Sequence, residues 1–206
     1  MTGEKLKLKN VRLAFTQNLF TPGSYKNEPG KKKKYSAKFL IPKLGPDGLV
    51  NPVVVAIKDE LMRLATLEWK DKVEQVIKEL RAENKICLYD GDIKSYDGYA
   101  GHYYISASNE TKPLYLRANP GTKDKPNLIT EESGELYSGC YVVAQISFWT
   151  QNNSFGKRIN ANLLGVQFYR PGEAFSGGGT ASVDEFEAVD GETNTVGGGS
   201  ASDLFT

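Results

Sequence analysis

The chain has 206 residues and 39% apolar side chains, which suits one domain with its own core, and its two cysteines and single histidine exclude a zinc-binding or disulfide framework. No apolar run is long enough for a signal peptide or a membrane span, so we expect a cytoplasmic protein without cofactor, metal or membrane partner. The net charge of +1 is unevenly divided: residues 173–206 hold seven of the 25 acidic residues and no basic ones, so residues 1–172 carry a net charge of +8.

Residues 4–15 and 34–41 are the first two predicted strands. Apolar residues alternate through both segments, and a slip in the alternation at Lys9-Asn10 predicts a β-bulge in the first. In the second strand, Lys38 lies on the face opposite an aromatic and aliphatic series. Both strands therefore have one apolar face and one more polar face.

The connection between these strands is the first segment that suggests nucleic-acid binding. It contains proline and glycine and delivers tyrosines and a lysine run to the second strand: Tyr25, Lys31, Lys32, Lys33, Lys34 and Tyr35. Lysines neutralise phosphates and aromatic rings stack on any base, so these residues and Lys38 are candidate contacts to a single strand. A solvated loop whose charges serve only solubility is the simpler interpretation.

A helix follows the second strand. Asn51 can cap it, and Pro52 suits its first position. Apolar residues then recur at helical spacing to about Glu83, which predicts one long helix or two helices with a break near Thr66.

Asp90 and Asp92 are the best candidates for catalytic chemistry, because a carboxylate pair can hold a divalent metal in a nuclease. Both lie among glycines, however, where turns use Asp for local hydrogen bonds, and we favour that role. The chain has no phosphate-binding loop, dinucleotide fingerprint or serine-hydrolase elbow, and His102 has no nucleophile motif beside it. We therefore expect a protein that is not an enzyme.

The tyrosine- and glycine-rich residues 96–104 allow two interpretations. They form a mobile stacking loop, with Tyr99 and Tyr104 as candidate nucleic-acid contacts, or a glycine turn followed by a strand. In the second case Tyr104 faces away from Tyr103, which packs inward with Ile105.

Further strands are predicted at residues 86–89, 101–107, 112–118, 139–150 and 158–170, the last two joined by a turn-rich hairpin. Alternation places Leu114 and Leu116 on one face and Tyr115 and Arg117 on the other, which we expect to be the polar face. In residues 141–149 the same alternation sets a core series, Val142, Ala144, Ile146 and Phe148, against Trp149 and its polar neighbours.

These strands complete the set of candidate nucleic-acid contacts. Tyr115, Arg117 and Trp149 would lie on a sheet face, and Phe155, Lys157 and Arg158 at or after the hairpin tip. Stacked bases and a planar guanidinium suit sequence-tolerant binding of single strands. The aromatic residues could instead cover a second core surface against the helix.

The predicted fold is mainly β with one long helix. Five or more mostly antiparallel strands around an inserted helix predict a five-stranded, partly open OB-fold barrel over residues 1–172, with a helix-capped β-sandwich as the alternative. Residues 173–206 contain glycine runs and little apolar surface, which predicts a disordered acidic tail. Phe175, Phe186 and the terminal Asp203-Leu204-Phe205 would then be apolar anchors for a partner.

Two segments of the chain carry a family resemblance. Residues 137–175, YSGCYVVAQISFWTQNNSFGKRINANLLGVQFYRPGEAF, and the opening NVRLAF and KYSAKFLIPK resemble phage-encoded, OB-fold single-stranded-DNA-binding proteins, including the T7-type proteins. The resemblance implies a protein that coats single strands during phage replication or recombination in the bacterial cytoplasm. It also implies an acidic tail that recruits replication proteins. Here the acids are spread out and Thr206 follows Phe205, whereas such tails often end in Phe after consecutive acids.

A different class of function competes with this one. A basic phage protein-interaction or structural module would also carry a cationic body, and the sequence leaves a homodimer open. A metal-dependent nuclease is a more distant alternative. Phosphate contacts predict a steep loss of affinity with added salt, and this property separates the first two hypotheses.

Overall fold

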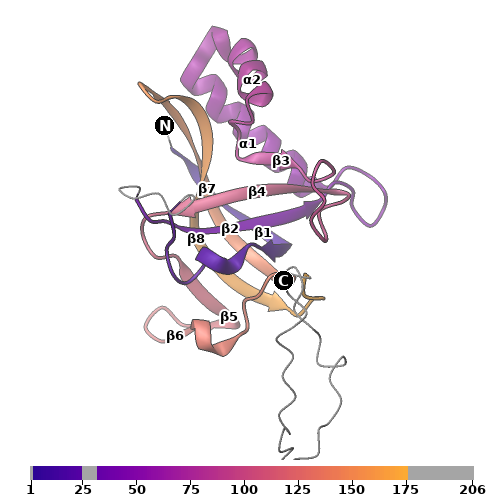
Figure 1. The fold of residues 1–206 in the computed structure, drawn as a ribbon, viewed down its shortest axis with the longest axis vertical. Coiled ribbons are helices and arrows are strands. Elements are labelled where there is room, and N and C mark those ends of the chain that lie inside the picture. Colours follow the sequence, from indigo (N-terminus) through magenta and orange to yellow (C-terminus); the bar gives the residue numbers. More distant parts are fainter. Residues whose placement is uncertain (1, 25–31, 176–206) are drawn as a thin grey trace, which may run out of the picture. The chain divides into compact units, whose positions relative to one another are not determined.

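The computed structural model describes residues 2–24 and 32–175, shown as a ribbon in Figure 1. Its elements in chain order are β1 (Thr2–Ala14), η1 (Thr16–Asn18), β2 (Tyr35–Pro42), α1 (Pro52–Trp69), η3 (Lys70–Lys72), α2 (Val73–Ala82), β3 (Leu88–Asp90), β4 (His102–Asn109), β5 (Leu114–Gly121), β6 (Pro126–Leu128), η4 (Glu131–Ser133), β7 (Tyr141–Asn153) and β8 (Gly156–Arg170). Within the described ranges no helix is long and apolar enough to cross a membrane.

Five of the strands close into a barrel. β1 pairs antiparallel with β2 and with β7, β2 continues to β4, and β7 continues to β8. A parallel pairing of β4 with β8, through Ala107↔Ala161 and Ser108↔Asn162, joins the two ends. This order confirms the predicted OB-fold barrel over the alternative sandwich, because a sandwich leaves its two sheets separate.

Three further strands extend the barrel sheet. β3 adds to β4, while β5 runs parallel to β8 and carries β6 at its outer edge. β6 lies in the segment 119–135, for which the sequence predicted no element. The parallel β4–β8 and β5–β8 pairs are the exceptions to the expected antiparallel arrangement.

The barrel interior is filled by the inward residues of the five strands. The core series of β7 is confirmed, since Val142, Ala144, Ile146 and Phe148 are fully buried. The bulge in β1 is also confirmed: the register shifts between Leu8 and Val11, and Asn10 has a positive φ of 55°. The shift restores the inward phase, so that Leu8, Val11 and Leu13 all reach the core.

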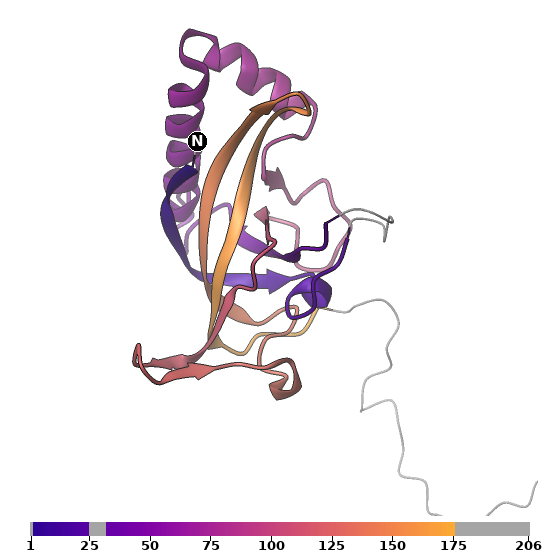
Figure 2. The ribbon, with the colours of Figure 1, turned by 90° about the vertical axis from the view of Figure 1, so that its left-hand side faces the viewer.

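The helical segment is two helices that stand beside the long β7–β8 hairpin (Figure 2). The Asn51 side chain accepts a hydrogen bond from the Val53 amide at 2.9 Å, with Pro52 in the first turn, as predicted. The break falls at Lys70, whose φ of 48° ends α1, and not at Thr66. The Thr150 hydroxyl donates to Glu68, which ties the end of α1 to β7.

Candidate nucleic-acid interface

The outer faces of β1, β2 and β4 lie side by side at the front of the barrel in Figure 1. The register places Arg12 beside Leu40, Leu40 beside Tyr104, and Lys38 beside Ser106. The neighbouring residues in each strand fill the core, so the side chains of the residues just named point out of the barrel. β2 and β4 are the second and third barrel strands, whose outer face and flanking loops bind oligonucleotides in OB folds.

Five aromatic rings gather on this face, and we call them the aromatic patch: Phe15, Tyr89, Tyr96, Tyr99 and Tyr104. Ring centroids are 5.2 Å apart for Phe15 and Tyr96 and 5.1 Å apart for Tyr99 and Tyr104, and Tyr89 stacks on Tyr104 at 5.0 Å. Tyr96 is 52% exposed, whereas Tyr99 and Tyr104 are buried. The patch therefore meets solvent mainly through Tyr96 and the half-buried Phe15 and Tyr89.

Lys38 reaches from β2 across the aromatic patch. Its Nζ lies 3.7 Å from the ring centroid of Phe15 and 5.4 Å from that of Tyr104. Burial, with a smaller contribution from the charge of Lys94, lowers the pKa of Lys38. The ring faces attract the ammonium and offset part of its lost hydration. A phosphate next to the patch would meet a poorly hydrated cation.

Phe15 has a backbone conformation that aromatic residues rarely adopt. It follows β1 directly and has φ 56° and ψ 62°, in the left-handed region. Such conformations cost about 1–3 kcal/mol and are concentrated at binding and catalytic sites. The turn places the Phe15 ring over Lys38 and beside Tyr96.

A second feature, the amide groove, adjoins this face and is lined by Lys34, Asn109, Trp149, Gln151, Asn160 and Asn162 together with Ser108 and Glu110. Trp149 is half-buried, and the Nδ2 of Asn160 is buried without a hydrogen-bond partner in the described part of the chain. Amides offer donors and acceptors to base edges, an indole offers a stacking face, and a lysine offers charge to a phosphate.

The lysine run meets the groove at Lys34, whose backbone pairs with Gly23 through two hydrogen bonds of 2.8 and 3.1 Å. The Nζ of Lys32 lies 2.9 Å and that of Lys34 3.8 Å from Glu110, and these ion pairs lower the pKa of that carboxyl. Lys33 is exposed and Tyr35 half-buried. Tyr25 and Lys31 lie outside the described residues.

The β7–β8 hairpin supplies the other predicted contacts. Phe155 is 87% exposed at the tip, Arg158 is exposed and Lys157 is half-buried. The charge of Arg158 acts on Tyr89, where it partly opposes the rise in pKa caused by burial. Arg158, close to the hairpin tip, thus lies within electrostatic reach of Tyr89 in the aromatic patch.

The expected exposure of Tyr115 is wrong. Alternation separated the two faces of this strand correctly, but Tyr115 is 3% exposed in the main core while Leu114 is 50% exposed. The Tyr115 hydroxyl donates to the carbonyl of Leu19, and its ring packs 4.7 Å from that of Phe20. β5 lies beyond the barrel beside β8, so the residues after β1 cover its Tyr115 face. Arg117 is exposed and pairs with Glu135 at 2.8 Å.

The positions of Tyr99 and Tyr104 contradict the interpretation of residues 96–104 as a mobile stacking loop. Gly101 makes a turn with φ 72° and β4 begins at His102, which confirms the alternative interpretation. Tyr104 faces the outer patch while Tyr103 lies on the side of Ile105. Neither Tyr99 nor Tyr104 has a ring face free to stack, because both are packed under their neighbours.

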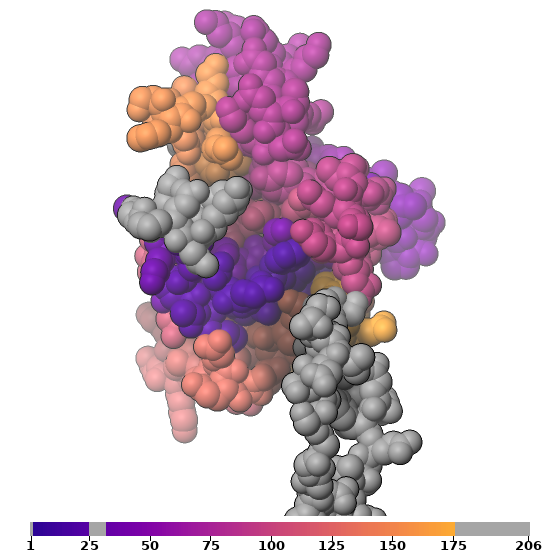
Figure 3. Space-filling model, in the orientation of Figure 1, coloured from indigo at the N-terminus to yellow at the C-terminus, as the bar shows by residue number. Residues whose placement is uncertain are grey.

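Sequence reasoning missed Phe15, Tyr89, Tyr96 and Arg12 as members of this surface. Phe15 continued the apolar alternation of β1 and was therefore assigned to its apolar series. The tyrosine-rich segment signalled an aromatic cluster, but the partner of each ring depends on the strand order. In the space-filling view, the indigo-to-violet segment that runs from β1 through η1 to β2 lies between the pink segment near residue 95 and the salmon β5–β6 region (Figure 3).

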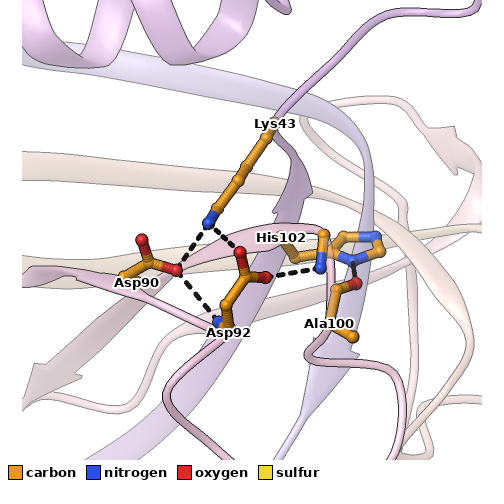
Figure 4. Close-up of polar contacts among 6 residues, drawn as sticks. Lys43, Asp90, Asp92, Ala100 and His102 are labelled. Atoms are coloured by element: carbon orange, nitrogen blue, oxygen red, sulfur yellow. Dashed lines mark hydrogen bonds and ion pairs between the residues drawn. The ribbon is translucent and has the colours of Figure 1, made fainter.

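The acidic pair Asp90 and Asp92 is engaged with a lysine (Figure 4). The Nζ of Lys43 lies 2.6 Å from each carboxylate, and Asp92 also accepts a hydrogen bond from the Gly101 amide at 2.7 Å. Hydrogen bonds from Lys43 lower the pKa of both carboxyls. Among the described residues no three His, Cys, Asp or Glu side chains gather as a metal site. The pair organises the turn before β4, as expected.

Comparisons with known proteins show which family this chain is similar to. Residues 4–196 match the family described as "Enterobacter phage Enc34, ssDNA-binding protein". Protein p50 of Acyrthosiphon pisum secondary endosymbiont phage 1 is 42% identical over 185 residues, which are 89% of this chain and 92% of that protein.

Two solved structures of the bacteriophage Enc34 single-stranded-DNA-binding protein are also similar. The one in complex with ssDNA has a TM-score of 0.63 at 31% identity, covering 82% of this chain and 88% of that chain. The other has a TM-score of 0.62 at 30% identity, covering 87% and 88%. The family match spans the whole barrel, and the chain therefore belongs to the phage single-stranded-DNA-binding proteins represented by that of Enterobacter phage Enc34.

Proposed function

We propose that this protein binds single-stranded DNA across the outer face of β1, β2 and β4 and protects it during phage DNA replication or recombination in the host cytoplasm. The observation that carries the proposal is the aromatic patch with Lys38 on the barrel face that OB folds use for oligonucleotides. The Enc34 relative solved in complex with ssDNA supports it.

The chemistry of the surface favours binding without strong sequence preference. Lys33, Lys38 and Arg158 supply charge to phosphates, which are the same in every sequence. Phe15, Tyr96 and the indole of Trp149 offer stacking faces, and every base has a π-face. The protein needs no catalytic group for this activity.

The acidic C-terminal segment gives the proposal a second part, which falls on residues outside the described ones. We propose that Asp203, Leu204 and Phe205 recruit replication partners, and that the acids of residues 173–206 compete with DNA for the basic face. A chain that ends at Phe175 should then bind oligo-dT more tightly at low salt and lose this advantage at high salt. Equal affinities at low salt would contradict the competition.

A fluorescence titration tests the main proposal. Trp69→Phe leaves Trp149, in the amide groove, as the reporter, because the chain has two tryptophans. We expect poly-dT to quench Trp149, the matched duplex to bind more weakly, and the affinity to fall steeply with salt.

The matched control is Trp149→Phe, in which the buried Trp69 remains and its emission should respond little to DNA. Binding that is absent, or insensitive to salt, would contradict a phosphate-binding function. It would favour a protein-interaction module instead.

A further inference from the structure

Residues 171–175, here called the C-terminal strap, lie against the barrel after β8 ends. The Tyr137 hydroxyl donates to the Gly172 carbonyl at 2.9 Å, and the Gly172 amide donates back to the same hydroxyl at 3.1 Å. The Nη2 of Arg12 donates to the Glu173 carbonyl at 2.6 Å, and the Phe175 amide donates to the Ser138 carbonyl at 3.0 Å. The strap is therefore held by the barrel, although the sequence predicted that the domain ends at Gly172.

The strap ends with the Phe175 ring on the aromatic patch. The guanidinium carbon of Arg12 lies 4.1 Å from the ring centroid, and the ring packs against the cluster that contains Tyr99 and Tyr104. Gly98 provides the space, since a Cβ there would clash with the Phe175 ring. Phe175, which the sequence suggested as an anchor for a partner protein, thus contacts its own domain.

These contacts are those of a stacked base. A flat aromatic ring lies on a guanidinium and packs against the buried cluster that includes Tyr99 and Tyr104, on the barrel face proposed for DNA. The cluster that the ring packs against also contains one unsatisfied polar group. Tyr99 is 1% exposed, and its hydroxyl has no hydrogen-bond partner among the described residues. A phenyl ring has no group to bond it, whereas every nucleobase has polar edge atoms.

We propose that the place filled by Phe175 is a nucleobase subsite, closed by Phe175 in the DNA-free protein. When a single strand binds, a base takes the place of the ring, stacks on Arg12 and hydrogen-bonds the Tyr99 hydroxyl. The proposal rests on the single-strand-binding function proposed above and specifies where one base lies. Closure by Phe175 weakens DNA binding, because the observed affinity equals the affinity of the open form multiplied by the fraction of molecules that are open.

The first test is Phe175→Ala in the full-length chain, with oligo-dT titrated at fixed salt. We expect an affinity roughly 3- to 10-fold higher, because the ring no longer competes with a base. Phe186→Ala removes the same side chain within the acidic segment and should leave the affinity unchanged. An unchanged or weaker affinity of Phe175→Ala would overturn the proposal.

The second test separates a base contact from a packing role. Tyr99→Phe removes a hydroxyl that has no partner in the DNA-free protein, so its urea midpoint should equal or exceed that of the wild type. Its affinity for oligo-dT should fall about 2- to 10-fold, the loss expected for one hydrogen bond. A purely structural Tyr99 predicts no change in affinity, and that result would also overturn the proposal.

The wild-type protein measured alongside distinguishes the two levels of inference. If it binds oligo-dT with a steep salt dependence but both variants titrate as the wild type does, the subsite is wrong and the single-strand-binding function stands. If the wild type itself fails to bind, the proposed function falls and the subsite falls with it.

Discussion

The aromatic patch and the amide groove are neighbouring parts of one surface with different physical properties. In the patch, Lys38 is held by ring faces and partly desolvated. In the groove, Lys34 lies opposite Glu110, and both side chains are substantially exposed. Interactions between solvated charges weaken with salt, whereas stacking and partly buried charges respond less. The patch should therefore supply salt-resistant affinity and the lysine run salt-sensitive affinity.

The largest expected effect concerns a residue that belongs to neither region. Tyr115→Ala removes a buried ring from the core and should lower the free energy of unfolding by about 3–5 kcal/mol. Tyr115→Phe keeps the ring and loses only the bond to the Leu19 carbonyl, about 1 kcal/mol. Urea unfolding measures both. If Tyr115→Phe instead weakened DNA binding at unchanged stability, the interface would extend beyond the patch and the groove.

Trp149→Ala tests the stacking contribution of the groove. Loss of one base–aromatic contact should cost about 1–3 kcal/mol of single-strand affinity while the fold stays intact. The slope of affinity against salt should not change, because no charge is removed. A fall in the urea midpoint without a fall in affinity would place Trp149 in a packing role.

Alanine at Lys31, Lys32, Lys33 and Lys34 tests the charged part of the comparison. The variant should weaken binding to every sequence alike, on the order of tenfold at moderate salt, and lower the logarithmic salt slope by up to about 3. Alanine at Lys72, Lys78 and Arg81, exposed on η3 and α2 and outside the proposed interface, is the control for lost charge. An unchanged slope would remove the lysine run from the interface.

The smallest effect is a pH dependence at Lys38. Its pKa is lowered by burial, so as the pH rises the folded protein loses this charge before its exposed lysines lose theirs. The lowered pKa also means that charged Lys38 lowers the free energy of unfolding. This destabilisation is present at low pH and disappears as the pH rises above the lowered pKa. Oligo-dT affinity measured from pH 7 to 10 should fall a few-fold further than in Lys38→Arg, which keeps its charge. Parallel profiles would show that Lys38 does not contact phosphate.

Local signals in the sequence predicted much of the fold. The Asn51 cap, the bulge near Asn10 and the inward series of β7 each depend on neighbouring residues, and each is confirmed. The exposure of Tyr115 was wrong because alternation defines two faces of a strand but not which face another segment covers. The aromatic patch depends on pairings among β1, β2, β3 and β4, which no local pattern specifies.

The strand order also constrains how the domain is made during translation. β1, residues 2–14, precedes the other strands of the barrel in the chain, yet its long partner β7 begins only at Tyr141. The barrel closes later still, when β8 reaches β4 through Ala161. Until β7 has been synthesised, the edge of β1 that pairs with β7 has no partner, and such edges invite pairing with other chains. Folding governed by such distant contacts is slow, so the nascent chain must remain unaggregated until nearly the whole domain has been synthesised.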